Sequence, residues 1–251
     1  LQRRESHQLH QDALTACTEA VDQNSTAQKA LAKALADAKS AQSITADQVA
    51  DGATIDTLKK AIAAVKNVEA VACKTSASTS DLKEYAKTAT SQTETAKKNA
   101  TAITAAAKAV TDSKNAKDQA NAQQALQSKI AEAQTLLDNS LYAVDDNSTR
   151  VTLESDIANA NTVLSQQGTD VKAMQDAVNT LTASMDAVNT SMANYSAAVE
   201  AQREAARQKA LNDYYARLRQ QQLLQQQQQT QPDGTGDQGT KLGTDDQETK
   251  P

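Results

Sequence analysis

Apolar residues recur along most of this chain at intervals of three and four, the spacing that keeps them on one face of a helix. The pattern predicts a first helix over about 6–43, a second over about 54–73, and a third that starts at 80 or 81 and runs to about 138. Two further helices are predicted over about 149–166 and from 171 towards 218. At about 1.5 Å per residue, the third helix would be roughly 85–90 Å long.

Capping signals stand in the connections between these helices. Thr45 and Gln48 have the spacing of a capping box ahead of the second helix. Gly168 stands where a left-handed residue is expected to end the fourth helix, and Thr169 or Asp170 is expected to cap the fifth. The helix ends are therefore predicted to be set by local sequence.

The apolar pattern occurs twice, 95 residues apart. The matched positions are Leu31, Leu35, Ala38, Leu58, Ile62 and Val68 in the first copy, and Leu126, Ile130, Ala133, Leu153, Ile157 and Val163 in the second. Each copy reads as helix, turn, helix, turn, helix, and the third helix of the first copy continues as the first helix of the second. Internal repeats of this kind indicate stacked structural units.

The repeat predicts an all-α fold of two tandem three-helix bundles that share one long continuous helix and form an elongated rod. The predicted units are residues 1–112 and 113–219, followed over 220–251 by a Gln-rich extension and a disordered polar tail or linker. The alternative architecture is one long antiparallel helical hairpin, against which the two short helices pack differently.

Composition favours a thin rod over a compact globule. Only 39% of the residues are apolar, much of that fraction is alanine, and the chain has no Phe or Trp. Alanine buries little area but is the best helix former and lets helices approach closely. The net charge of −5 argues against a nucleic-acid partner. No run of roughly 20 apolar residues is present to cross a bilayer.

Cys17 and Cys73 are predicted to form a disulfide. Suppose that the first two predicted helices pair antiparallel. The residue numbers of facing positions then add to about ninety, and the numbers of the two cysteines also add to ninety. The pairs that set this register are Leu31 with Leu58 and Val21 with Val68. A disulfide implies an oxidising, extracytoplasmic location. Two buried free thiols, common in cytosolic proteins, are the alternative.

No catalytic, cofactor or metal site is expected from the sequence. His7 and His10 have a spacing that could hold a metal weakly, but no third ligand is evident, and two solvated histidines are the favoured interpretation. Asp145 and Asp146 are not followed by EF-hand spacing. No Ser-His-Asp or Cys-His set and no phosphate-binding glycine loop can be assembled, so the chain is predicted not to be an enzyme.

The last predicted helix carries a possible interaction surface at Arg203, Arg207, Tyr214 and Tyr215. Its basic residues could contact an anionic envelope polymer or lipid surface. The favoured interpretation is a solvated face with salt bridges to nearby acidic residues such as Glu200. The tyrosines could stack against sugars or a partner, or simply cover the end of a bundle.

The stretch from about 126 to 188 resembles the FIVAR modules of Gram-positive surface proteins. The matching residues are Leu126, Ile130, Ala133, Tyr142, Leu153, Ile157, Ala160, Val163, Leu164, Thr169, Asp170, Val171, Ala177, Leu181 and Met185. Family members usually carry an aromatic residue just before the second helix, where this chain has Arg150 and Val151. The first copy, about 31–110, matches only in its first two helices. The resemblance implies tandem three-helix bundles that act as stalks or adhesive surfaces.

Together these features predict a non-enzymatic, extracytoplasmic structural stalk or adhesion module of a bacterial cell-surface protein. The expected partner is an unidentified protein or cell-envelope polymer, and the chain is expected to be a monomer. Because it starts at Leu1, we expect a processed or truncated form that is attached to the membrane or cell wall through segments outside it, such as an N-terminal anchor. The alternatives are an oligomerising coiled-coil component of a secretion or toxin system and an accessory region of a larger envelope enzyme.

Overall fold

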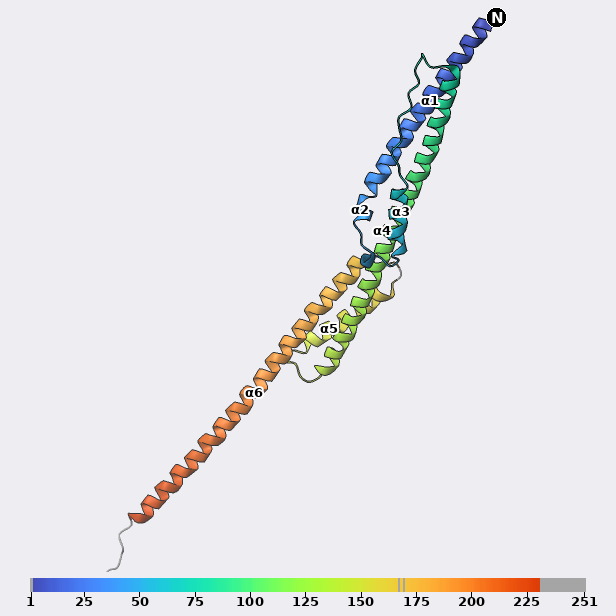
Figure 1. The fold of residues 1–251 in the computed structure, drawn as a ribbon. Coiled ribbons are helices and arrows are strands. Elements are labelled where there is room, and N and C mark those ends of the chain that lie inside the picture. The colour runs from blue at the N-terminus through green and yellow to red at the C-terminus, as the bar shows by residue number, and fades with distance from the viewer. Residues whose placement is uncertain (1, 167, 169, 231–251) are drawn as a thin grey trace, which may run out of the picture.

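The computed structural model describes residues 2–166, 168 and 170–230, and every regular element in this part of the chain is helical (Figure 1). The helices are α1 (Gln2–Asp37), α2 (Lys39–Gln42), a short 3-10 helix (Ala46–Gln48), α3 (Ala53–Ala63), α4 (Thr79–Asn139), α5 (Ser148–Ser165) and α6 (Val171–Gln229). Two bundles lie end to end and share α4, so the predicted all-α rod is confirmed. The predicted disordered tail, from 231 onward, lies outside the described residues.

The first bundle is built on a parallel pairing of α1 with α4. Residue numbers rise together along the pair: Cys17 packs with Leu82, and the Asn24 side-chain amide donates to Gln92 Oε1 at 2.7 Å. Buried positions on α1 recur at alternating intervals of four and three, as in a coiled coil. They are Ala13, Cys17, Ala20, Asn24, Ala27, Leu31 and Ala34. Most of these side chains are small, so the two backbones can approach closely.

Several predicted helix ends are confirmed. The Thr45–Gln48 capping box is present, and the N–H of Thr45 donates to Gln48 Oε1 at 3.0 Å. Asp170 caps α6, because its carboxylate accepts the N–H of Ala173 at 2.7 Å. Gly168 has a φ of +76°, the left-handed conformation expected after α5. The other candidate cap, residue 169, lies outside the described residues.

The predicted second helix, over about 54–73, is wrong in its second half. α3 ends at Ala63, and residues 64–78 form an arm without helix that runs back beside α1 to the start of α4 (Figure 1). Val68, predicted to face Val21, is 43% exposed. Val65 and Val71 also lie in this arm, and valine is a mediocre helix former because its branched Cβ restricts χ1.

The predicted disulfide is present, but the register used to infer it is wrong. Cys17 and Cys73 are bonded with their Cα atoms 5.9 Å apart, within the ordinary range for a disulfide. Leu58 shares a buried cluster with Leu31, but it also lines a hollow with Ala41, which comes after Leu31 in the chain. An extended residue advances about 3.3 Å along the chain, against about 1.5 Å in a helix. The non-helical arm therefore covers more length per residue than the predicted helix would, and this extra length brings Cys73 back to Cys17.

The second bundle consists of the C-terminal part of α4, α5 and the first part of α6. Its largest fully buried side chains are Leu126, Leu153, Met174, Leu181 and Val188. The repeat holds here in three dimensions, because the positions equivalent to buried Leu31, Ala38 and Leu58 are also buried. It fails only at the arm, where exposed Val68 corresponds to a half-buried valine on α5.

In the first bundle, the connection ahead of α3 is tied to α4 at Ser113. The N–H of Ala50 donates to the Ser113 carbonyl at 3.1 Å, and the N–H of Asp51 donates to Ser113 Oγ at 2.8 Å. Asp51 Oδ1 accepts the N–H of Ala53, the first residue of α3, at 3.0 Å. One serine thereby satisfies two backbone donors of the connection and fixes where α3 begins.

The second bundle has the same arrangement at Ser191 of α6. The N–H groups of Asp145 and Asp146 donate to the Ser191 carbonyl at 3.1 Å and to its Oγ at 2.8 Å. Asp146 Oδ1 accepts the N–H of Ser148 at 2.8 Å. This bond and one from the Ser148 hydroxyl lower the pKa of the Asp146 carboxyl. We call each arrangement a serine clasp.

The serine clasps provide a matched mutational test. We expect Ser113→Ala and Ser191→Ala each to reduce the free energy of unfolding by about 0.5–1 kcal/mol, because a backbone N–H loses its acceptor while alanine regains some helix propensity. Ser196→Ala, at an exposed position of α6, is the control and should be neutral or slightly stabilising. Urea denaturation followed by circular dichroism measures this; equal midpoints for all three variants would contradict the role of the clasps.

The disulfide should stabilise the first bundle selectively. For cysteines 56 residues apart, Cys17→Ser with Cys73→Ser should lower its stability by about 4 kcal/mol in the chain-entropy description. Hydrogen exchange should speed up in the N-terminal halves of α1 and α4, with α5 unchanged as the internal control. Reduction of the unaltered chain should reproduce the pattern, and unchanged exchange in α1 would show that the bond is not needed there.

Candidate interaction surface

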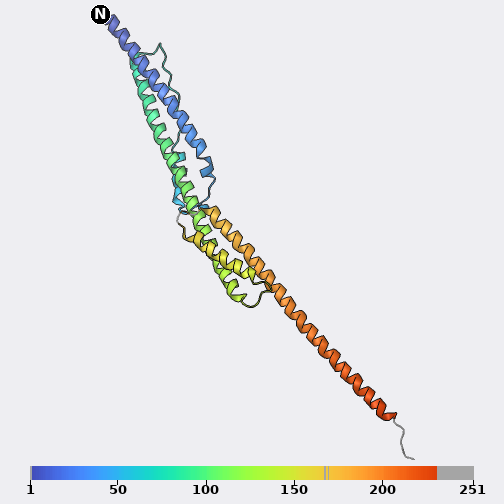
Figure 2. The same cartoon turned by 180° about the vertical axis from the view of Figure 1, so that it is seen from behind.

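α6 leaves the second bundle after Met192 and projects alone (Figures 1 and 2). We call residues 193–229 the projecting segment. From 201 to 229 every residue in it is exposed. Its exposed large apolar side chains are Tyr195, Leu211, Tyr214, Tyr215, Leu218, Leu223 and Leu224. All four residues predicted as an interaction surface lie on this segment.

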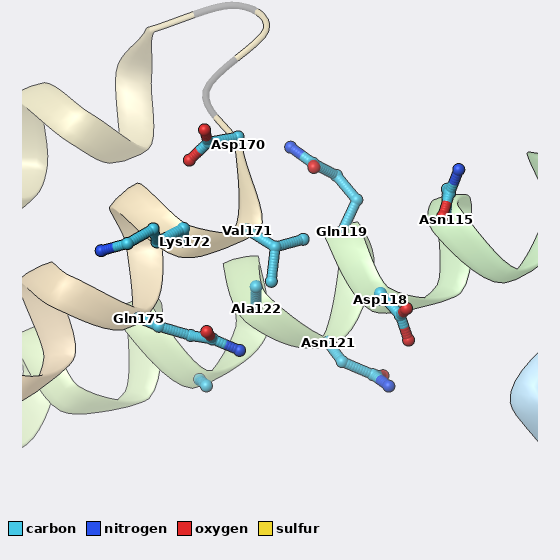
Figure 3. A pocket seen from close by; sticks show the side chains of 10 residues that line it. Asn115, Asp118, Gln119, Asn121, Ala122, Asp170, Val171, Lys172 and Gln175 are labelled. Atoms are coloured by element: carbon cyan, nitrogen blue, oxygen red, sulfur yellow. The ribbon is translucent and has the colours of Figure 1, made fainter.

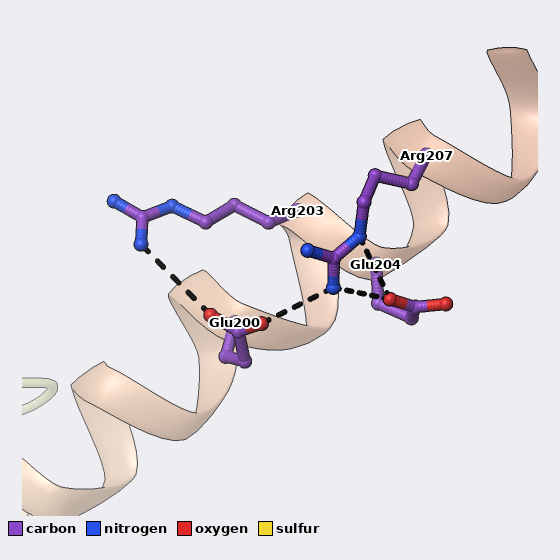
Figure 4. A network of polar contacts seen from close by, with 4 residues as sticks. All are labelled: Glu200, Arg203, Glu204 and Arg207. Carbon is purple, nitrogen blue, oxygen red and sulfur yellow. Dashed lines mark hydrogen bonds and ion pairs between the residues drawn. The ribbon is translucent and has the colours of Figure 1, made fainter.

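The arginines predicted for that surface are ion-paired along the helix, as the favoured interpretation expects (Figure 4). Arg207 Nε donates to Glu204 at 2.9 Å, and Arg207 Nη2 lies 3.3 Å from Glu200 Oε1. Arg203 lies 3.9 Å from the other carboxylate oxygen of Glu200. Exposed pairs contribute at most about 1 kcal/mol each to stability. Their consequence is local neutrality, which weakens the case for an anionic polymer as the ligand here.

Asp213 occupies the middle of the segment and is also paired. Lys209 Nζ lies 2.8 Å from Asp213 Oδ2. This hydrogen bond, then the Lys209 charge, and then the Arg217 charge lower the pKa of the Asp213 carboxyl. The same hydrogen bond and the Asp213 charge raise the pKa of Lys209.

Tyr214 and Tyr215 are 56% and 53% exposed, and their rings meet edge to face with centroids 5.6 Å apart. At about 1.5 Å per residue they lie roughly 33 Å beyond Met192. The interpretation that they cover the end of a bundle is therefore wrong. They form an aromatic pair in the projecting segment of α6, where every residue from 201 to 229 is exposed.

A second exposed feature is the connection between α4 and α5. Tyr142 is 86% exposed, and neighbouring Leu141 is 51% exposed. Tyr142 has a φ of +61°, a left-handed conformation that costs a residue with a Cβ about 1–2 kcal/mol. Asp145, three residues on, is held by the clasp at Ser191. The strained turn is thus presented at the end of the second bundle beside α6.

A hollow of about 840 Å³ lies between α4 and the start of α6 (Figure 3). Apolar side chains from Ala122, Ala125 and Val171 contribute to its lining. The polar lining residues are Asn115, Asp118, Gln119, Asn121, Asp170 and Gln175, with Lys172 at one edge. The charged members already have partners, because Asp118 pairs with Lys114, Lys172 with Asp176, and Asp170 caps α6. The hollow is an open notch between α4 and the start of α6, and its charged side chains are already engaged.

His10 is partly exposed, and its ring also contacts the arm and the start of α4. Its Nε2 lies 3.2 Å from the carbonyl oxygen of Thr75, and its Nδ1 lies 3.4 Å from the Thr79 hydroxyl. Both ring nitrogens therefore engage the segment that leads from the disulfide into α4. His7 is exposed. Among the described residues no group of three metal-ligating side chains comes together.

Comparison of the chain with protein-family models, curated proteins and solved structures found no match, and none of these comparisons bears on the resemblance to FIVAR modules. Within residues 2–166, 168 and 170–230, no helix combines the length and apolar character that a membrane crossing requires. The projecting segment is therefore put forward as a candidate surface on its geometry alone.

Asp213 provides a pH-dependent test of the projecting segment. We expect its carboxyl to titrate below the ordinary value of about 3.9 in NMR, and Lys209→Gln to raise it towards that value. Because the folded pKa is lowered, the stabilisation is present above about pH 4 and disappears as pH falls through the lowered pKa. Lys172→Gln, in the second bundle, is the matched control. Identical Asp213 titrations in all three proteins would contradict the pairing.

Proposed function

We propose that this chain is a non-enzymatic, extracytoplasmic stalk or adhesion module of a bacterial cell-surface protein. The observation that carries the proposal is the end-to-end arrangement of two slender bundles on one uninterrupted helix. Such an arrangement supplies length and stiffness from few residues, because each residue of α4 adds about 1.5 Å along the axis.

The junction between the bundles supports a rigid spacer. α4 passes from the first core to the second without a break, with Val110 fully buried in one and Leu126 fully buried in the other. Two units joined by a flexible linker would rotate independently. Here the relative orientation is set by helix geometry, so the far end is held at a defined distance.

The disulfide supports an extracytoplasmic location. Cys17 is completely buried among Ala13 and Leu82, and its bond to Cys73 fixes an arm that contributes little burial of its own. Stable disulfides of this kind are typical of oxidising compartments and rare in the cytosol. The FIVAR resemblance of the second unit agrees with a surface protein that is attached through segments outside this chain and binds a protein or envelope polymer.

A second candidate function is an oligomerising coiled-coil component of a secretion or toxin system. The projecting segment favours it, because a long helix with exposed leucines and tyrosines, unpacked by the rest of the described chain, is what an assembly would use. No comparable observation favours the third possibility, an accessory region of a larger envelope enzyme.

Location and redox state test the proposal together. Protease added to intact source cells should degrade the chain while sparing a cytoplasmic marker. Alkylation in denaturant should modify Cys17 and Cys73 only after reduction, as read by mass spectrometry. A chain that is protected until lysis, or whose cysteines are alkylated without reduction, would contradict an extracytoplasmic stalk. The second candidate function predicts in addition that a complex is recovered with the oxidised chain.

A further inference from the structure

The projecting segment carries a symmetric set of exposed residues. Leu211 and Leu218 flank the adjacent Tyr214 and Tyr215 at equal distances along the chain. At about 100° per residue, all four fall within an arc of about 100°. They are 36–56% exposed, although large apolar side chains at helical spacing normally face a partner. We call these four residues the 211–218 face.

We propose that the 211–218 face binds the same face of a second copy of this chain, as an antiparallel two-stranded coiled coil. The two-fold axis passes between Tyr214 and Tyr215. In this register Leu211 lies opposite the partner subunit's Leu218, and Tyr214 lies opposite the partner subunit's Tyr215. The sequence alone predicts a monomer. The observation that favours a dimer is that no residue within 2–166, 168 and 170–230 packs against the projecting segment over 201–229, where every side chain is exposed.

The surface of the segment has room for such packing. A hollow of about 320 Å³ beside Tyr215 and Leu218 is lined by Asn212, Arg219 and Gln222 as well. In the proposed register, the side chains that approach it are the partner subunit's Tyr214 and the partner subunit's Leu211. A side chain that enters a hole formed by several residues of the facing helix is the packing unit of coiled coils.

Polar residues on the same helix side favour the antiparallel orientation. Glu200 and Glu204 precede the 211–218 face, whereas Gln225 and Gln229 follow it on the same side. Antiparallel pairing places Glu204 opposite the partner subunit's Gln225, and Glu200 opposite the partner subunit's Gln229. Each carboxylate then meets an amide that can donate to it. Parallel pairing in register would instead place Glu200, Glu204 and Arg207 each opposite its own copy. The Glu–Arg pairs within each helix offset part of that repulsion, so the glutamate–amide contacts are the main preference for the antiparallel register.

The length of the segment also fits. The two-fold axis lies midway between Glu200 and Gln229, so the helices overlap over roughly 45 Å. The partner's α6 ends opposite Glu200, before it reaches Met192 and the second bundle. The bundles therefore stay clear of each other at opposite ends of the overlap. The dimer is a rod with a disulfide-bonded first bundle pointing away at each end.

Sedimentation of the purified full chain over a concentration series tests the proposal. We expect a monomer–dimer equilibrium with a dissociation constant in the micromolar range, because only four apolar side chains from each copy form the centre. A chain that stays monomeric well above that range would overturn the proposal. Circular dichroism at each concentration shows whether helix content is retained.

Paired leucine variants locate the interface. Leu211→Gln with Leu218→Gln should weaken dimerisation about tenfold or more, since central apolar contacts dominate such interfaces. Leu223→Gln with Leu224→Gln is the matched control, because those exposed leucines lie more than about 120° from the centre of the 211–218 face. The control should change the dissociation constant by about twofold or less. Equal weakening by both pairs, or by neither, would overturn the assignment of the face.

One substitution tests the orientation. Gln225→Lys places a lysine opposite the partner subunit's Glu204 in the antiparallel dimer, twice per dimer, and should tighten binding about threefold or more. In a parallel dimer the two lysines would face each other and binding would weaken. Weaker binding by Gln225→Lys would therefore overturn the antiparallel arrangement. Because purified protein is used, none of these outcomes depends on the cellular location tested above.

Discussion

Close contact between α1 and α4 through small side chains is the constraint on which the first half of the molecule depends. The seam is lined largely by alanine, with Asn24 bonded across it to Gln92. Each alanine buries little area, so the seam gains stability from its length rather than from any bulky cluster. Because each buried residue contributes little, a core of this kind requires a long contact between helices. The long, thin shape and the continuous α4 follow from that requirement.

The remaining devices of the first bundle offset what a thin seam lacks. The Cys17–Cys73 bond fixes the arm, which forms no helix. His10 contacts the arm at Thr75 through one ring nitrogen and the start of α4 at Thr79 through the other. The clasp at Ser113 fixes the opposite end of the bundle. The second bundle has larger buried side chains, including Leu153 and Met174. It has a serine clasp but no disulfide. Covalent support is thus found where apolar burial is smallest.

The projecting segment has a different balance. It owes its helix to good intrinsic helix formers, alanine, glutamine and arginine, and to ion pairs such as Lys209–Asp213. None of these requires tertiary packing. Its leucines and tyrosines are therefore free to face another molecule. In the proposed functions, the stalk and the coupling element are separate parts of one chain, because α4 sets the distance and the end of α6 presents a surface.

The sequence by itself determined what depends on neighbours along the chain: the helical spacing, the caps at Thr45 and Asp170, the long α4 and the repeat that gives two bundles. The arm was missed because the helical spacing of valines does not show whether those side chains will be buried against another helix. The cysteine pairing was predicted correctly from a helix register that is wrong. The greater rise per residue of the extended arm made up for the shorter helix.

Only the tertiary structure decided what depends on contacts between distant segments. The serine clasps escaped notice because Ser113 and Ser191 lie 78 residues apart, outside the 95-residue repeat, and their bonds run to backbone N–H groups. The candidate surface residues could be chosen from sequence. Whether Tyr214 and Tyr215 cover a bundle or stand free was set by where α6 leaves the second core, which is a matter of bundle length and not of local pattern.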